Sequence, residues 1–320
     1  MDLRPEYEHR TVIVTGAAGF VGSHLVDALV AHGARVTAID DLSDGREKNL
    51  RASLSQITFV RRSVTEESAL DEILAGADFV FHLAANASVP RSVEDPEADF
   101  EANVIGTYRI LEAARRTGTK RIVFTSSAAV YGDPVREPMD ESHPFHPKSP
   151  YGGSKLAAEF LLDSYSRCFD LDHRRVRLFN TYGPRQRKYV MFDLLEKLRA
   201  NPGRLAMLGS GNQVRDYSYV SDTVDAILLA GAHPEARGRV FNVAGDRAID
   251  LRALIELVLR IVRIPHPQVT FTGESWKGDI VRWIADTSAV RALGFTPRVD
   301  LEEGIRRLVD WHREEFAPPW

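Results

Sequence analysis

Tyr151 and Lys155 lie four residues apart in the stretch YGGSK. On a helix this spacing puts both side chains on one face, with the lysine ammonium beside the tyrosine phenol. A neighbouring cation favours the phenolate and lowers the tyrosine pKa from its usual value of about 10. Ser127 follows an apolar stretch and offers a hydroxyl that can bond a reacting alcohol. The three residues predict a general base, Tyr151, that takes a proton from a substrate hydroxyl near neutral pH.

A Y-x-x-x-K pair also fits a surface tyrosine beside a solvated lysine, so its context matters. Three glycines, Gly16, Gly19 and Gly22, follow the apolar stretch TVIVT at 11–15. The first allows a sharp turn, the second lets backbone approach a pyrophosphate, and the third lets the next helix pack closely. That helix start adds free N–H groups and a positive dipole end, which suit phosphate. A tight turn without a ligand remains the alternative at this point.

Asp40 and Asp41 stand about 20 residues beyond the glycines, at the end of the next apolar stretch, where an acidic residue binds a ribose diol. A carboxylate there repels a 2′-phosphate, so the sequence predicts NAD rather than NADP. Two surface carboxylates in a turn are the alternative, which the glycine motif ahead of them makes the weaker interpretation.

Alternating strand and helix patterns position these residues in the first half of the chain. This alternation predicts an α/β fold, a Rossmann-type doubly wound parallel sheet covered on both faces. The expected strands are 10–15, 35–40, 58–61, 79–83, 121–126 and 175–179, and the expected helices are 20–32, 66–75, 97–117 and 154–169.

From about residue 180 the elements become shorter and mixed, with frequent glycines. Helical patterns recur at 190–200, 221–230, 251–264 and 301–315. We expect a nucleotide-binding domain over 1–179, to which 216–245 returns, and a smaller mixed α/β substrate domain from 180–215 and 246–320.

Composition limits the class of protein. The chain has 320 residues, 44% hydrophobic content and a net charge of −4, with basic residues scattered, so neither nucleic-acid nor membrane binding is expected. The N-terminal residues lack the apolar core of a signal peptide, and no apolar run reaches transmembrane length. The single cysteine, Cys168, fits a reducing compartment and is expected to be buried within a helix. A cytoplasmic protein without a metal site is the prediction.

His82 is a candidate for catalysis by residue type alone. It lies within an apolar strand pattern and has no partner visible in the sequence, so we interpret it as structural.

Several motifs in combination resemble the extended short-chain dehydrogenase/reductase family, in its NAD-dependent epimerase/dehydratase group. The resemblance is strongest to the epimerases that interconvert UDP-glucose and UDP-galactose. It covers residues from about 10 to 310 and rests on the glycine motif, His82-Leu83-Ala84-Ala85, Asn103, Ser126-Ser127, Val130-Tyr131-Gly132, Ser149-Pro150-Tyr151 with Lys155, and Arg177-Leu178-Phe179-Asn180.

The resemblance implies oxidation of a nucleotide sugar at C4, rotation of the 4-keto intermediate and reduction on its other face. Tyr151 would remove and return the O4 proton, Ser127 would assist, and Lys155 would tune Tyr151 and bond the nicotinamide ribose. The residues implied for NAD are Gly16, Gly19, Phe20, Val21, Gly22, Asp40, Asp41, Ser63, Val64, Leu83, Ala84, Ala85, Asn103, Ser126, Tyr151, Lys155 and Phe179. Those implied for the substrate are Ser88, Ser127, Tyr151, Asn180, Arg185, Arg215, Trp276, Lys277, Asp279 and Trp283.

Some positions depart from the family pattern. Ser63 stands where an adenine-contacting aspartate is usual, and Trp276 where many relatives carry an arginine. Lys277 supplying the charge and Trp276 stacking on the base remain alternatives, and Arg187 fits a surface charge as well as the phosphate groove. Trp283 matches the position at which small residues admit N-acetyl groups, so its bulk favours an unacetylated hexose.

Ala128 and Ala129 follow the catalytic serine, where related 4,6-dehydratases carry an acidic pair and decarboxylases a glutamate. Alanine neither donates nor accepts a proton, which favours epimerisation. The alternatives are the same reaction on UDP-glucuronate or UDP-GlcNAc, a reductase of 4-keto nucleotide sugars, and an NAD-sensing protein without the chemistry. The resemblance also implies a homodimer formed through the helices at 97–117 and 149–169.

Overall fold

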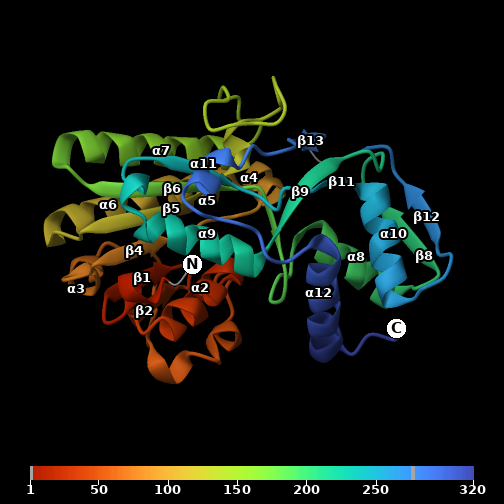
Figure 1. The fold of residues 1–320 in the computed structure, drawn as a ribbon, viewed down its shortest axis with the longest axis horizontal. Coiled ribbons are helices and arrows are strands. Elements are labelled where there is room, and N and C mark those ends of the chain that lie inside the picture. Colours follow the sequence, from red (N-terminus) through yellow and green to blue (C-terminus); the bar gives the residue numbers. More distant parts are fainter. Residues whose placement is uncertain (1–2, 275–277) are drawn as a thin grey trace.

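A seven-stranded, wholly parallel sheet forms the centre of the larger lobe (Figure 1). The computed structural model describes residues 3–274 and 278–320. The strand order is β10-β6-β5-β4-β1-β2-β3. Their bounds are β1 (Thr11–Thr15), β2 (Arg35–Asp40), β3 (Thr58–Arg61), β4 (Phe79–His82), β5 (Arg121–Ser127), β6 (Asp172–Leu178) and β10 (Val240–Val243).

Helices cover both faces of this sheet because the strands are apolar on both sides. In β1, Val12 and Val14 face α2 (Phe20–Ala31) and α9 (Val220–Ala232), whereas Ile13 faces the opposite layer. The opposite layer contains α3 (Leu70–Leu74), α5 (Pro96–Phe100), α6 (Gly106–Thr117) and α7 (Pro150–Phe169). The smaller elements of this lobe are α1 (Arg4–Tyr7), α4 (Val89–Glu94), α11 (Ser288–Ala292), a π-turn at Glu101–Ile105, and 3₁₀ turns at Glu47–Leu50, Leu54–Gln56, Ala128–Val130 and Pro234–Ala236.

A smaller lobe, on the right of Figure 1, has its own apolar core. It contains a sheet ordered β11-β9-β13 with β7 paired to β9, and a separate β12–β8 pair. Its elements are β7 (Asn180–Tyr182), α8 (Tyr189–Ala200), β8 (Arg204–Met207), β9 (Val214–Tyr219), β11 (Ala248–Asp250), α10 (Leu251–Val262), β12 (Gln268–Phe271), β13 (Arg282–Trp283) and α12 (Leu301–Phe316). Between β9 and β11 the chain returns to the large sheet as α9 and β10.

The Rossmann-type fold predicted from the sequence is confirmed, and the differences are local. Of the helix expected over 66–75, only α3 forms in the structure. The helix expected over 97–117 is interrupted by the π-turn. The helix expected from 154 begins at Pro150, because Ser149 caps it by accepting a hydrogen bond from the Gly152 amide at 3.2 Å. Tyr151 therefore lies in the first turn of the same helix as Lys155.

Cys168 is exposed, so the expectation of a buried cysteine was wrong. It lies in the last turn of α7, where Arg167 and Phe169 are exposed too. In the described part of the chain, no helix is long and apolar enough to cross a membrane.

Candidate active site

The glycine turn between β1 and α2 forms a cradle made of backbone. Gly16 has φ +67°, and a Cβ there would lie 2.7 Å from the Ala84 amide nitrogen. A Cβ on Gly22 would lie 2.0 Å from the Gly16 carbonyl oxygen. The α2 N-cap, Gly19, offers no side chain to satisfy the first N–H groups. Free amides, small residues and the dipole end of α2 therefore fit the pyrophosphate of a dinucleotide.

Asp40 ends β2 next to this cradle and is buried. Its carboxylate accepts hydrogen bonds from the amides of Ala18 at 2.9 Å and Leu42 at 2.8 Å. Burial raises its pKa, while the two amide donors oppose that change. Asp41 is exposed and accepts only local hydrogen bonds from Ser43. Of the two predicted carboxylates, Asp40 alone is held against the glycine turn, at the place for a ribose diol.

His82 is buried between two threonines. Thr15 Oγ1 accepts hydrogen bonds from the amides of Leu83 and Ala84, so its proton is directed at His82 Nδ1, 2.7 Å away. His82 Nε2 then donates to Thr107 Oγ1 at 3.0 Å. Burial lowers the pKa of His82 to about 3, so the ring is neutral and its nitrogens are both occupied within the fold.

The residues of the predicted catalytic group converge at the end of β5 and the start of α7. Lys155 Nζ donates to the Thr125 carbonyl oxygen at 2.9 Å and lies 4.7 Å from the centre of the Phe124 ring. Ser127 Oγ accepts a hydrogen bond from the Ala129 amide at 3.1 Å, which leaves its proton free for another acceptor. A hydrogen bond between Ser127 and Tyr151 lowers the pKa of the phenol.

Burial has a larger effect on both titrating groups than their neighbours have. It raises the pKa of Tyr151 to about 12 and lowers that of Lys155 to about 8. The expectation that a neighbouring cation lowers the pKa of this phenol is therefore not met in the protein without ligands, because desolvation penalises the phenolate. Lys155 is still protonated at neutral pH, since Asp99 and Glu159 oppose the effect of burial.

Asn103 and Asp99 form a hydrogen-bond network next to the catalytic group. Asn103 Nδ2 donates to Asp99 Oδ1 at 3.0 Å and to Ser154 Oγ at 2.9 Å, and its Oδ1 accepts from the Asn86 amide at 2.8 Å. Asn103 therefore joins the π-turn, α7 and the loop after β4. Sequence reasoning missed Asp99, whose only signal was a spacing of four residues before Asn103.

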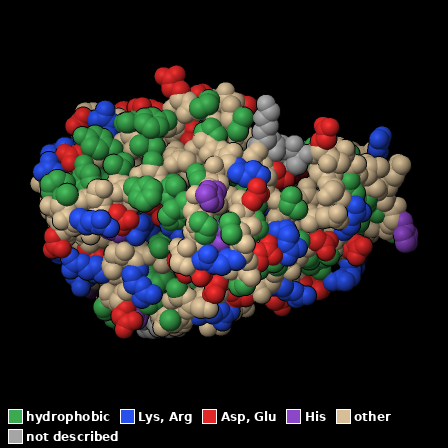
Figure 2. All heavy atoms as spheres, turned by 90° about the horizontal axis from the view of Figure 1, so that it is seen from above, with side chains coloured by type: hydrophobic (Ala, Val, Ile, Leu, Met, Phe, Trp, Pro, Cys, Tyr) green, Lys and Arg blue, Asp and Glu red, His purple; other side chains and the backbone are tan. Residues whose placement is uncertain are grey.

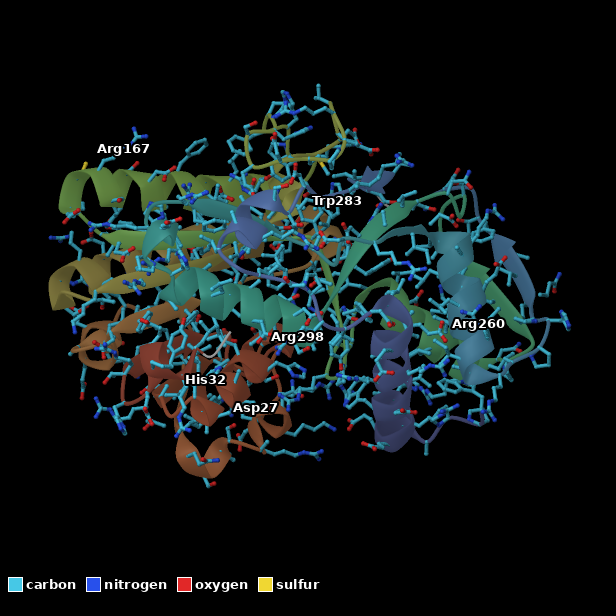
Figure 3. All side chains as sticks on the ribbon, viewed as in Figure 1. Asp27, His32, Arg167, Arg260, Trp283 and Arg298 are labelled. Carbon is cyan, nitrogen blue, oxygen red and sulfur yellow. The ribbon has the colours of Figure 1, made fainter. Side chains whose placement is uncertain are left out.

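Arg215, Asp279 and Trp283 come together on the smaller lobe. Arg215 Nη2 donates to Asp279 Oδ1 at 2.8 Å, and its guanidinium lies 5.4 Å from the centre of the Trp283 ring. Trp283 also contacts Phe179 and lies where the two lobes meet (Figure 3). Asn180 Nδ2 donates to the Asp216 carbonyl oxygen at 3.3 Å. These residues form a polar and aromatic wall whose arginine, now paired with Asp279, is of the type that binds the phosphates of a nucleoside diphosphate.

Other predicted site residues have local roles. Arg185 Nη2 donates to Asp27 Oδ2 at 2.7 Å, midway along α2, and so is held apart from the Arg215 group (Figure 3 labels Asp27). Ser88 caps α4, and Ser63 bonds Thr65. Val64 is buried with its Cγ2 2.9 Å from where a Cβ on Gly106 would lie. The predictions for Trp276 and Lys277 lie outside the described residues.

The fold and site together define an enzyme class: a Rossmann-type protein with a backbone cradle for a dinucleotide and a Ser-Tyr-Lys group at its strand ends. Residues 12–244 match the family described as the NAD dependent epimerase/dehydratase family. The chain belongs to this family, and NAD is its cofactor.

Known relatives agree with this classification. A UDP-glucose 4-epimerase of Mycolicibacterium smegmatis is 39% identical over 319 residues, covering 95% of this chain and 98% of that protein. The structure of a Thermotoga maritima UDP-glucose 4-epimerase with UDP-glucose has a TM-score of 0.88 and 34% identity, covering 95% and 99% of the two chains.

Other relatives act on different sugars or catalyse different reactions. A UDP-N-acetylglucosamine 4-epimerase of Methanobrevibacter ruminantium, in complex with UDP-N-acetylmuramic acid, has a TM-score of 0.90 at 33% identity, covering 97% and 100% of the two chains. dTDP-glucose 4,6-dehydratases and UDP-glucuronic acid decarboxylases are also similar to the chain. Members of this family therefore catalyse several reactions on several nucleotide sugars.

Proposed function

We propose that the protein is a UDP-hexose 4-epimerase that interconverts UDP-glucose and UDP-galactose. The observation that carries this proposal is the pairing of an intact Ser127-Tyr151-Lys155 group with two buried alanines, Ala128 and Ala129, directly after the serine. The site can move a proton on and off one hydroxyl, and these two positions supply no second acid or base.

In this reaction Tyr151 takes the proton from the sugar O4 and later returns it. Ser127, with its proton free, bonds the same oxygen and orders the path between sugar and phenol. The protonated Lys155 stabilises the phenolate that forms, which matters because burial alone disfavours it. Bound NAD supplies a reversible hydride acceptor for C4 of the sugar. It would be held by the glycine cradle, by Asp40 and by Lys155.

Dehydration at C5 and C6 needs an acid and a base in addition to the C4 chemistry. Ala128 is buried in an apolar cluster with Val130 and Tyr131, and Ala129 is buried as well, so neither position offers a titrating group to a substrate. This supports epimerisation over the dehydratase reaction of other family members.

The wall of the smaller lobe supports a nucleotide-sugar substrate. Arg215 suits phosphate oxygens, and the indole of Trp283 beside it narrows the space for a substituent on the sugar. A UDP-GlcNAc 4-epimerase is the second candidate, favoured by the similarity to the Methanobrevibacter ruminantium enzyme. The same reaction on UDP-glucuronate and a 4-keto-sugar reductase are the remaining alternatives. Asp40 disfavours the reductase because it repels the 2′-phosphate of NADPH.

Incubation of the purified protein with UDP-galactose tests the proposal directly. We expect UDP-glucose to form without release of NADH into solution. A product only from UDP-GlcNAc would establish the second candidate, and a 4-keto-6-deoxy sugar from dTDP-glucose would contradict epimerisation. Replacement Trp283→Ser should increase activity on UDP-GlcNAc relative to UDP-galactose. Unchanged discrimination would reject Trp283 as the selective side chain.

The same proposal includes a cytoplasmic homodimer in which NAD is held by the larger lobe (1–179 with 216–245) and the sugar nucleotide by the smaller. The argument for the dimer is an apolar face on α5, α6 and α7, where Phe100, Phe160 and Phe169 are each 53% exposed and Tyr108 is 43% exposed. Figure 2 shows hydrophobic side chains gathered over the α7 side of the molecule. A second copy of this chain would cover that face.

A further inference from the structure

A buried ion pair lies directly beneath the catalytic group. Glu159 follows Lys155 by one turn on the same face of α7. Its carboxylate accepts hydrogen bonds from Arg177 Nε at 2.9 Å and Arg177 Nη2 at 2.6 Å, across from β6. Ser126 Oγ also donates to it, at 2.5 Å. Glu159 thus connects the helix that carries Tyr151 and Lys155 to the strand end that carries Ser127.

Arg177 is itself fixed in place. Its Nη1 donates to the Tyr131 hydroxyl at 2.7 Å, and that hydroxyl donates to Asn242 Oδ1 at 2.6 Å. The guanidinium lies 4.9 Å from the centre of the Tyr131 ring and 4.8 Å from that of Phe145. Arg177 and Glu159 are at most 2% exposed. Well-packed apolar residues can tether two elements as strongly as a buried ion pair. Tethering alone therefore does not explain why this buried position carries a charged pair.

The electrostatic surroundings of Lys155 supply that reason. Two carboxylates face its ammonium, Glu159 from its own helix and Asp99 from α5, and both raise its pKa against the effect of burial. From β4, His82 is neutral and adds no charge. On α7 the neighbouring titratable group is Tyr151. On β6, Arg177 is paired with Glu159, and Arg175 lies 3.7 Å from the same carboxylate while its nearer partner is Asp163. Removal of either carboxylate leaves the ammonium with less compensation.

We propose that Glu159 is a positioning residue of the active site, which holds Ser127 against Tyr151 and keeps Lys155 protonated. The kinetic part of this inference rests on the proposed epimerase reaction, whereas the electrostatic part does not. Loss of the carboxylate charge would deprotonate Lys155 at a lower pH, and Tyr151 would then lose the cation that favours its phenolate.

The chain provides a matched control one turn further along α7. Asp163 Oδ2 accepts a hydrogen bond from Arg175 Nη1 at 2.8 Å, so this pair joins the same helix to the same strand. Neither Ser126 nor Lys155 contacts Asp163 among the interactions of the described residues. Arg175 Nη1 also lies 3.7 Å from Glu159 Oε2. Asp163→Asn therefore weakens the tether between α7 and β6 but removes none of the hydrogen bonds of Glu159 with Arg177 and Ser126.

Nuclear magnetic resonance of lysine labelled at the ε-carbon measures the first effect without substrate. The Lys155 signal is assigned by its absence in Lys155→Arg. In the wild-type protein it should titrate near the value of about 8 given by its burial. We expect Glu159→Gln to lower this pKa by about one pH unit, the low end for loss of an opposite charge. Asp163→Asn should leave it unchanged. An unchanged pKa in folded Glu159→Gln would overturn the electrostatic role.

Kinetics with UDP-galactose measure the positional effect. Glu159→Gln should lower kcat by at least about tenfold with little change in KM, and it should narrow the pH range of activity from both sides. Glu159→Asp retains the charge but shortens the reach to Ser126, so the Lys155 pKa should recover while kcat stays low. Ser126→Ala removes only the hydrogen bond and should lower kcat about threefold to tenfold.

These variants distinguish a failure of the inference about Glu159 from a failure of the proposed function. An equal loss of kcat in Asp163→Asn and Glu159→Gln would mean that the pair only tethers the helix, which overturns the inference. If Glu159→Gln does not fold, Glu159→Asp and Ser126→Ala still test the positional role, and wild-type kcat in both would reject it. A wild-type protein inactive on every nucleotide sugar tested would reject the proposed function, while the resonance experiment would still decide whether Glu159 holds the charge of Lys155.

Discussion

Tyr151 illustrates how far residue spacing can predict chemistry. The four-residue interval to Lys155 correctly placed both groups on one helix, and Ser127 lies where it can bond the phenol. The pKa of the phenol was not predictable in this way, because it depends on how many segments exclude water from the ring. In the folded protein burial raises it to about 12, and the hydrogen bond with Ser127 opposes this effect.

Tyr151→Phe tests the role of the phenol. We expect kcat to fall by at least about 10²-fold, because the change removes the group that takes and returns the proton. KM should change little, since the ring remains. Ser164→Ala removes an exposed hydroxyl further along α7, bonded only to the Phe160 carbonyl oxygen among the described interactions, and should leave kcat unchanged. A Tyr151→Phe protein with wild-type kcat would exclude Tyr151 as the base.

His82 leads to a prediction about stability and pH. Its pKa is about 3 when folded and about 6.5 when unfolded. Below pH 6.5 the unfolded chain binds a proton that the folded protein refuses, so the contribution of His82 to the free energy of unfolding is lost as the pH falls. Between pH 6.5 and 5 this loss amounts to about 2 kcal/mol.

Denaturant unfolding of wild type and His82→Gln at pH 7 and pH 5 measures this contribution. The wild-type free energy of unfolding should fall more steeply with pH than that of the variant, because glutamine does not titrate. Parallel dependences would show that His82 is protonated in the folded protein.

At the scale of elements, the β1–α2 turn was predicted in full and several helix boundaries were not. The spacing of the glycines predicts where the backbone must pass close to other backbone within one turn. In the structure Gly16 and Gly22 lie at such close contacts. The start of α7 was predicted four residues late because proline reads as a loop residue, although it is favoured in the first turn of a helix. The π-turn in the long helix before β5 has no sequence signal that we recognised.

Gly22→Ala tests the close approach of α2 to the turn. The added Cβ would lie 2.0 Å from the Gly16 carbonyl oxygen, so the backbone of the cradle must shift. We expect the free energy of unfolding to fall by about 1–3 kcal/mol and NAD binding, measured by calorimetry, to weaken. Gly153→Ala is the matched control, because no described atom outside its own stretch of helix lies within 4 Å of its added Cβ. It should raise stability by about 1 kcal/mol through helix propensity. Equal behaviour of the two variants would contradict the packing argument.

At the scale of the whole molecule, two lobes meet over the carboxyl ends of the large sheet, and the aromatic group of Trp283 and Phe179 lies at their junction. The exposed aromatic side chains on α5, α6 and α7 lie away from this junction. They leave the active site complete within one chain, so assembly would affect stability more than chemistry.

Phe160→Glu tests the proposed dimer. A charge on the 53% exposed ring position should dissociate the assembly, because a carboxylate cannot be buried against a second copy without a partner. Light scattering should report the mass of two chains for wild type and of one chain for the variant. Leu208→Glu places the same charge at a 51% exposed leucine of the smaller lobe and should leave the dimer intact. A wild-type protein with the mass of a single chain would reject the proposal.

The sequence by itself determined the features that depend on residues close along the chain: the strand alternation, the glycine turn, the distance from it to Asp40, and the shared face of Tyr151 and Lys155. These follow from helix and strand geometry, which is the same in any protein. The tertiary structure alone decided which distant residues meet. It pairs Arg185 with Asp27 rather than with the Arg215 group, and it buries Glu159 and Arg177 beneath Ser127. It also determines the pKa values of Tyr151 and Lys155, because desolvation and charge act through space and depend on every segment that packs around a group.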